Sequence, residues 1–163
     1  MDSSDTAAIT INPELTTAYL NRGVIYEYFG RHHQAIADYN KVIKLEPIDI
    51  EVYYNRGISF AGLGNYQQAI ADFTNAIKLD PMHIKAYNNR GAVYATLGDY
   101  HQAIKDFDTA INLNNQDSRA YYNRGLTYKI LGNHNQSIKD FQSAALLGDK
   151  RAQDYLKSKG IGW

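Results

Sequence analysis

A five-residue stretch returns at constant spacing along this chain. YYNRG at 53–57 recurs as YNNRG at 87–91 and YYNRG at 121–125, and YLNRG at 19–23 precedes them. The four copies are evenly spaced. A fixed period of about 34 residues indicates a repeat protein, because each repeat is too small to bury its apolar face alone and stacks on its neighbours. The chain is therefore expected to fold as a row of similar units.

Other positions keep the same period. A second glycine follows seven residues after the first, as Gly30, Gly64, Gly98 and Gly132. A small residue and then an aromatic residue come next, as Ala35 and Tyr39, Ala69 and Phe73, Ala103 and Phe107, and Ser137 and Phe141. This pattern resembles the tetratricopeptide repeat, a helix-turn-helix unit of about 34 residues. The main departure is an arginine where the family most often has leucine, at Arg22, Arg56, Arg90 and Arg124.

The resemblance implies an all-α fold, a right-handed α-solenoid of four helix-turn-helix repeats with a C-terminal capping helix. The predicted repeats cover residues 16–49, 50–83, 84–117 and 118–151, and residues 152–163 hold the capping helix and a tail. The first helix of each repeat (helix A) ends near the second glycine, as C-cap glycines do. The capping helix is expected within the amphipathic run 150–159, with Tyr155 at the aromatic position of the repeat.

Two interpretations of residues 1–15 remain open. The stretch AITINP at 8–13 aligns with AIKLDP at 76–81, which indicates the remnant of a preceding repeat. A remnant helix would pack on the first repeat through Ala8, Ile9 and Ile11. The alternative is a flexible tail.

Helical spacing divides each A-helix into two faces. Tyr53, Gly57 and Phe60 share one stripe, and its glycine lets the second helix of the repeat (helix B) come close. In the family, the opposite stripe lines a concave groove that holds a peptide. By this resemblance the candidate peptide-binding residues are Asn21, Asn55, Asn89, Asn123, Lys85, Arg119, Tyr54, Tyr122, Ile58 and Leu126.

The four groove asparagines suit an extended peptide, because an amide side chain offers both a donor and an acceptor to a peptide backbone. The alternative is that they cap or bridge neighbouring repeats. Four hydrogen bonds would contribute about 4 kcal/mol, whereas micromolar binding needs about 8 kcal/mol. Apolar groove residues must therefore supply much of the affinity.

Groove charges differ between the two ends of the chain. The first two repeats contribute Glu27 and Glu51, and the last two contribute Lys85, Arg119 and Lys129. Complementary charge steers encounter and fixes register, so the acidic part of a bound segment is expected beside repeats three and four. The family's clamp for a C-terminal carboxylate is absent, because Leu20, Val24 and Asn89 stand at three of its positions.

Each of the four arginines is followed, at one constant spacing, by an aspartate: Asp38, Asp72, Asp106 and Asp140. In a hairpin turning at the second glycine, Arg56 and Asp72 lie at similar height. The arrangement predicts a row of ion pairs between packed helices, since the guanidinium fork matches a carboxylate. The alternative is an anion or phosphate site.

Catalytic and metal chemistry are not expected. There is no cysteine, and His32, His33, His101 and His134 lie near turns of different repeats. Packed helices lie about 8–10 Å apart, whereas zinc needs ligands about 2 Å from one centre. The sequence also contains no catalytic triad and no phosphate-binding loop after a strand. We therefore expect no enzyme activity, no cofactor and no metal.

Bulk properties narrow the remaining classes. Seventeen basic residues balance seventeen acidic ones, so no general field attracts nucleic acid. No apolar run is long enough to span a membrane, and the polar, acidic N-terminus is unlike a signal peptide. These observations predict a cytoplasmic scaffold or adaptor that binds a protein or peptide partner. The alternative is a self-assembling structural protein, a homo-oligomer joined through its open ends or convex face.

Overall fold

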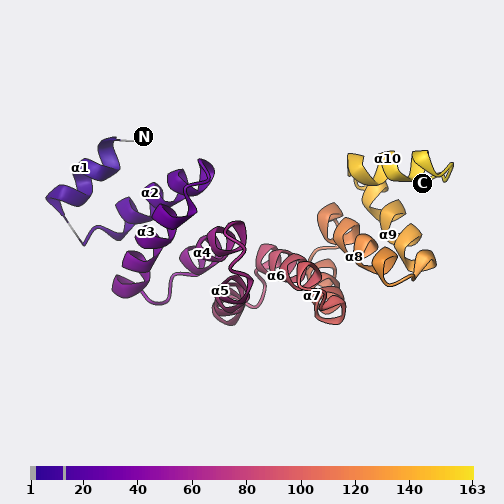
Figure 1. Cartoon of the computed structure of the whole chain (residues 1–163), viewed down its shortest axis with the longest axis horizontal. Coiled ribbons are helices and arrows are strands. Elements are labelled where there is room, and N and C mark those ends of the chain that lie inside the picture. Colours follow the sequence, from indigo (N-terminus) through magenta and orange to yellow (C-terminus); the bar gives the residue numbers. More distant parts are fainter. Residues whose placement is uncertain (1–2, 13) are drawn as a thin grey trace. The chain divides into compact units, whose positions relative to one another are not determined.

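The computed structural model describes residues 3–12 and 14–163 (Figure 1), and within them the regular secondary structure consists of ten α-helices. Their bounds are α1 Ser3–Ile11, α2 Thr16–Tyr28, α3 His32–Leu45, α4 Ile50–Gly62, α5 Tyr66–Leu79, α6 Ile84–Thr96, α7 Tyr100–Leu113, α8 Ser118–Ile130, α9 His134–Leu146 and α10 Lys150–Ser158. The predicted all-α fold is confirmed. The proposed match of Pro13 with Pro81 lies outside the described residues.

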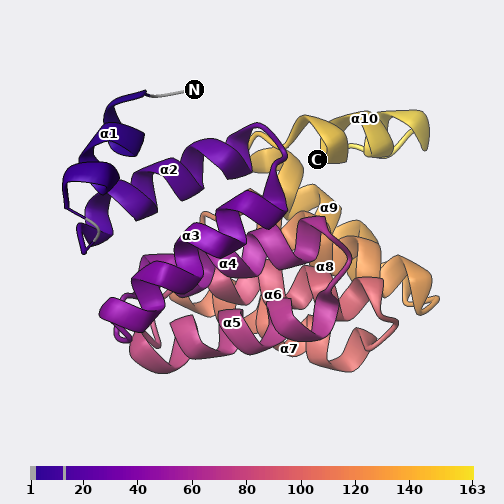
Figure 2. The same ribbon diagram turned by 60° about the vertical axis from the view of Figure 1, so that its left-hand side comes forward.

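Four helical hairpins, α2–α3, α4–α5, α6–α7 and α8–α9, follow one another along the chain (Figures 1 and 2). Each turns at a glycine in the left-handed region, where a side chain would be strained. At Gly64 the φ angle is 76°, and the amide of Asn65 donates to the carbonyl oxygen of Phe60 at 2.9 Å. The predicted ends of the A-helices are confirmed.

The first glycine of each repeat faces the aromatic ring of helix B. A Cβ atom added to Gly57 would lie 2.8 Å from Cε1 of Phe73, and Phe73 is only 1 % exposed. The same contact recurs between Gly91 and Phe107. The predicted contact of this glycine with helix B is confirmed, and the small residue allows the close approach of the two helices.

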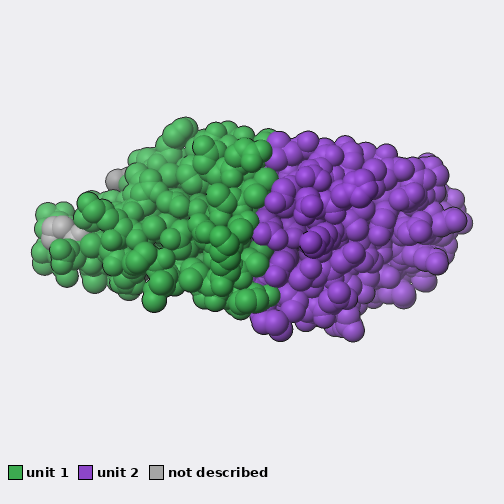
Figure 3. Space-filling model, turned by 90° about the horizontal axis from the view of Figure 1, so that it is seen from below, with its two compact units in different colours: residues 1–81 green, residues 82–163 purple. Residues whose placement is uncertain are grey.

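The chain forms two compact units, residues 1–81 (unit 1) and residues 82–163 (unit 2), coloured separately in Figure 3. In unit 1, α3 packs against both α2 and α4, and the A-helices α2 and α4 also contact each other. In unit 2, α7 packs against α6 and α8, α9 packs against α8 and α10, and α6 contacts α8. The A-helices of each unit are therefore neighbours and present a continuous surface within that unit.

The N-terminal segment contains a helix, α1, which contacts α2. Ala8 and Ile9 are half-buried, but Ile11 is 86 % exposed. The expected packing through Ile11 is therefore wrong, because this side chain lies at the end of the helix and points into solvent.

Deletion of residues 1–14 is expected to lower the melting temperature by about 2–4 °C, the effect of losing about 1 kcal/mol in a chain of this size. The physical reason is the loss of the half-buried Ala8 and Ile9 against α2. Differential scanning calorimetry measures the shift, and Ile11→Ser serves as the control that leaves it unchanged. An unchanged melting temperature on deletion would show that α1 adds nothing to stability.

Candidate functional site

The predicted asparagines lie on the A-helices, in pairs within each unit. Asn21 of α2 is exposed and Asn55 of α4 is half-buried, and these two helices contact each other. Asn89 of α6 and Asn123 of α8 are both half-buried, again on contacting helices. We call this surface the A-helix face of each unit, made by Asn21, Asn55 and Ile58 in unit 1 and by Lys85, Asn89, Arg119, Asn123 and Leu126 in unit 2.

Tyr54 is more buried than the groove prediction supposed. It is 9 % exposed, and its ring centroid lies 6.0 Å from that of Phe73. The equivalent residue in α6, Asn88, is 1 % exposed, and its Nδ2 donates to Oδ2 of Asp117 at 2.6 Å. This position therefore packs inside the repeat stack, and Tyr54 offers little surface to a ligand.

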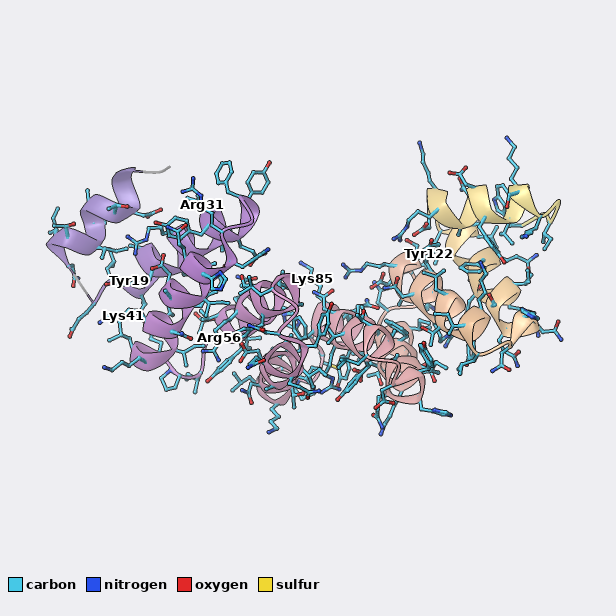
Figure 4. The ribbon with its side chains drawn as sticks, viewed as in Figure 1. Tyr19, Arg31, Lys41, Arg56, Lys85 and Tyr122 are labelled. Atoms are coloured by element: carbon cyan, nitrogen blue, oxygen red, sulfur yellow. The ribbon has the colours of Figure 1, made fainter. Side chains whose placement is uncertain are left out.

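Tyr122 occupies the same position in α8 but stays half-buried. Its ring lies 5.6 Å from that of Phe141, and the guanidinium carbon of Arg151 lies 4.0 Å above it. Figure 4 labels Tyr122 where α8 approaches α10. Tyr122 thus keeps part of its ring near the surface, which Tyr54 does not.

Two acidic residues that were predicted for the groove, Glu27 and Glu51, lie on α2 and α4 of unit 1. The hydroxyl of Tyr39, which is buried, donates to Oε2 of Glu27 at 3.2 Å. Burial raises the pKa of Glu27, although the bond from Tyr39 opposes that shift. Burial also raises the pKa of Tyr39, and the charge of Glu27 adds to the effect. Glu51 on α4 is exposed.

Unit 2 carries basic groups on this side. Lys85 of α6 (Figure 4) and Arg119 and Lys129 of α8 are exposed. Helix α10 adds Arg151, which lies over Tyr122, and Tyr155, whose ring centroid lies 4.6 Å from Nζ of Lys129. Neither Arg151 nor Tyr155 was among the residues predicted for this face.

Arg151 and Tyr155 were not predicted for this face because the connection between α9 and α10 departs from the repeat period. The A-helices all begin at the same place in their repeats, but α10 begins at Lys150, two positions before residue 152, where the period would place its start. The turn has Gly148 at φ 89°, and the amide of Asp149 donates to the carbonyl oxygen of Ala144 at 2.9 Å, as in the turns inside the repeats. The expected place of Tyr155 at the aromatic position of the repeat is therefore wrong, since the register of α10 is shifted.

Asp149 fixes the start of α10. Its carboxylate accepts a bond from the amide of Ala152 at 3.2 Å and two bonds from Arg151. Burial opposes ionisation, but the bonds from Arg151 and Ala152 outweigh it and hold the pKa of Asp149 below its usual value. The N-cap of α10 and the position of Arg151 thus depend on one ionised side chain.

The arginine–aspartate pairs form inside each repeat, as predicted. Nε and Nη2 of Arg56 donate to the two carboxylate oxygens of Asp72, both at 2.7 Å. Equivalent two-bond pairs join Arg22 to Asp38, Arg90 to Asp106 and Arg124 to Asp140. Because carboxylates occupy the guanidinium forks, the ion-pair interpretation is confirmed over the anion-site alternative.

Two features of these pairs were not predicted. The guanidinium of Arg56 lies 5.7 Å from the ring centroids of both Tyr53 and Phe60, at i−3 and i+4 on the same helix. Its Nη1 also donates to Oδ1 of Asn40 in the preceding hairpin at 2.6 Å. In unit 2, Arg124 bridges Asp140 and Asp108 in the same way. Arg56 and Arg124 therefore join neighbouring hairpins as well as the two helices of one hairpin.

In the described part of the chain, no group of three His, Cys, Asp or Glu side chains is placed to hold a metal ion. None of the helices in this part of the chain combines the length and apolar character required to cross a membrane.

Comparison with known proteins adds a family and a fold. Family models of the tetratricopeptide repeat match residues 16–49, 50–83, 84–117 and 118–147. A crystal structure of MamA superposes with a TM-score of 0.84 at 27 % identity, covering 91 % of this chain and 87 % of that one. The Arabidopsis OM64 TPR domain gives 0.68 at 29 % identity, covering 71 % and 96 %.

A third structure, the first TPR of Spaghetti (RPAP3) bound to the HSP90 peptide SRMEEVD, gives a TM-score of 0.69. It is 24 % identical and covers 72 % of this chain and 93 % of that one, so the likeness concerns the fold alone. No protein with a curated function matches the sequence significantly.

Proposed function

Since this chain belongs to the tetratricopeptide repeat family, we propose that it is a protein-interaction scaffold whose A-helix faces bind an extended segment of a partner protein. The observation that carries the proposal is the repeated asparagine at the surface of contacting A-helices, Asn21 with Asn55 and Asn89 with Asn123. A row of amide side chains can pair with the donors and acceptors of a peptide backbone whatever its sequence. The RPAP3 domain, which shares the fold, was solved with a peptide bound.

Apolar side chains beside the asparagines supply the remaining affinity in this proposal. Ile58 in unit 1 and Leu126 in unit 2 are half-buried, so each has surface left to cover. Removing apolar surface from water contributes about 25 cal/mol per Å², and a few such contacts exceed the contribution of the hydrogen bonds. Tyr54 contributes to the stability of unit 1 and little to this surface.

The two units differ in charge, and this difference bears on which part of a bound segment each unit contacts. Unit 1 has six lysines and arginines against ten aspartates and glutamates, and unit 2 has eleven against seven. The exposed basic residues on the A-helices of unit 2 include Lys85, Arg119 and Lys129. We therefore assign the acidic stretch of a bound segment to unit 2.

Replacing Asn55, Asn89 and Asn123 together by alanine is expected to weaken partner binding about a hundredfold, since three hydrogen bonds contribute about 1 kcal/mol each. The measurement is affinity capture of partners from the source cell, followed by titration of a captured partner. The matched control replaces three asparagines on B-helices, Asn75, Asn112 and Asn135, by alanine. Equal capture by the wild type and both variants would contradict the proposal.

Self-association is the second candidate. It is favoured by exposed apolar side chains on α1 and α9, where Ile11 is 86 % exposed and Leu146 is 72 % exposed. Size-exclusion chromatography with light scattering separates the candidates, because a scaffold that acts through its A-helix faces has no need to oligomerise. A mass that rises with concentration, and falls again in an Ile11→Ser, Leu146→Ser variant, would favour self-association.

A further inference from the structure

We infer that α10 is part of the ligand-binding surface of unit 2 and that Lys129 and Arg151, on the two sides of the α8–α10 contact, bind acidic side chains of the partner segment. This inference rests on the proposed function and deepens it, because it names the chemistry recognised at one end of the A-helix face. A capping helix alone needs only an apolar side towards the last hairpin and a polar side towards water. Helix α10 has both, and in addition it holds these two cations in fixed positions.

Arg151 is held on two sides and remains accessible on a third. Its plane lies over the ring of Tyr122, with the guanidinium carbon 4.0 Å from the centroid. Its Nε and Nη2 donate to the carboxylate of Asp149, whose side chain is only 6 % exposed. The Nη1 nitrogen takes part in neither bond, and the side chain of Arg151 stays 56 % exposed. The guanidinium can therefore receive a further carboxylate without first being ordered.

Lys129 of α8 makes an equivalent contact with a ring of α10. Its Nζ lies 4.6 Å from the ring centroid of Tyr155, and that ring packs 4.5 Å from the ring of Phe141. The cation of α8 thus lies on a ring of α10, while the cation of α10 lies on a ring of α8. Attraction to these aromatic faces orders the side chains of Lys129 and Arg151 before a ligand arrives. Binding a ligand therefore costs little further side-chain entropy.

Cations outnumber acids on α8 and α10, because residues 118–130 and 150–158 contain six lysines and arginines and one aspartate, and Asp117 and Asp149 are the two N-caps. Asp149 is already paired with Arg151, and its side chain is only 6 % exposed. Asp154 is exposed and shares a stripe with Lys150 and Lys157, although at i+3 it also neighbours Arg151 on the surface of α10. The resulting surface suits the carboxylates of an acidic peptide, which a guanidinium binds through two bonds.

A nucleic acid fits this surface less well. Single strands bind proteins by stacking bases on aromatic rings within a basic groove. Here the faces of Tyr122 and Tyr155 are covered by the protein's own cations, so they offer no platform for a base. The geometry therefore favours side-chain carboxylates, which need the cations and not the rings.

The test uses the full chain and a synthetic nine-residue peptide with four glutamates among leucines and glycines, compared with its glutamine counterpart. Fluorescence anisotropy in low salt is expected to show binding of the glutamate peptide at least tenfold tighter than the glutamine peptide. In the ¹⁵N NMR spectrum of the protein, the glutamate peptide is expected to shift the amides at the end of α8 and the start of α10.

Two double variants with the same loss of charge locate the site. Lys129→Gln with Arg151→Gln is expected to weaken the glutamate peptide about tenfold, because two charge contacts are lost. Lys150→Gln with Lys157→Gln removes two cations from the other stripe of α10 and is expected to change the dissociation constant less than twofold. Melting curves of both variants verify that the fold is kept.

Four outcomes would overturn the inference. Equal weakening in both double variants would show only a general positive field. Tight binding of a single-stranded oligonucleotide, lost in Lys129→Gln with Arg151→Gln, would assign the surface to nucleic acid. Peptide-induced shifts confined to Asn89 and Asn123 would leave the proposed function standing and remove α10 from the site. If the glutamate peptide causes no shift anywhere, the inference fails, whereas the proposed function is judged by the asparagine variant.

Discussion

The Asp72→Ala variant is expected to lose about 3 kcal/mol of unfolding free energy, at the low end of the range for breaking a buried ion pair. Asp72 has 4 % of its side chain exposed and Arg56 has 18 %, so the substitution leaves a mostly buried guanidinium without its carboxylate. The partial exposure of Arg56 lets water compensate in part, which places the cost at the lower end. Chemical denaturation followed by circular dichroism measures the change.

A double-mutant cycle separates the ion pair from the packing of each side chain. Arg56→Ala and Asp72→Ala together are expected to cost less than the sum of the single changes, with a coupling energy of about 1–3 kcal/mol. Lys78→Ala, an exposed substitution on the same helix as Asp72, is the control and is expected to change stability by less than about 0.5 kcal/mol. Strict additivity of the two changes would show that the pair contributes nothing beyond its separate contacts.

Phe73→Ala is expected to destabilise the protein by about 3–5 kcal/mol, because it empties the position between the helices of the second repeat. The ring is 1 % exposed and packs against both Gly57 and Tyr54. Phe29→Ala provides the control, since that ring is 63 % exposed and loses little contact. Thermal and chemical denaturation are both suitable measurements.

The contact between Gly57 and Phe73 also predicts that the effect of Gly57→Ala on stability changes sign when the ring of Phe73 is removed. In the wild type, Gly57→Ala is expected to cost about 1–3 kcal/mol, because the added methyl group would collide with the ring at 2.8 Å. In the Phe73→Ala background the same substitution is expected to stabilise by up to about 1 kcal/mol, since the collision is gone and alanine favours the helix. If Gly57→Ala destabilises both backgrounds equally, the ring is not what requires the glycine.

The periodic positions made most of the fold predictable. Gly64 marks the end of an A-helix because its backbone adopts a positive φ angle, which glycine adopts without strain. Gly57 marks the buried face because only a small residue fits against the ring of Phe73. The pairing of Arg56 with Asp72 followed from equal distances to the turn. These are local consequences of one hairpin, so a single repeat carries the information.

Features that depend on contacts between repeats were harder to predict. The bond from Arg56 to Asn40 requires the stacking of two hairpins, and the burial of Tyr54 depends on the same stacking. The shifted register of α10 did have a signal, because Leu147-Gly148-Asp149 repeats the pattern of Leu131-Gly132-Asn133 at an internal turn. The regular period concealed this signal, because it predicted that the fourth repeat runs through residue 151 and that the next helix begins at residue 152.

The hydrogen bonds of Arg56 to two different hairpins affect how unit 1 unfolds. One guanidinium is shared between Asp72 in its own hairpin and Asn40 in the hairpin before it. Separating these hairpins breaks the bond to Asn40, and unfolding the second hairpin breaks this bond and the two bonds to Asp72. Amide protons of α3 and α4 are therefore expected to exchange with solvent through one shared opening. The smallest cooperative element of unit 1 is then a pair of hairpins, so fraying at the N-terminal end stops at α1 or proceeds through both hairpins together.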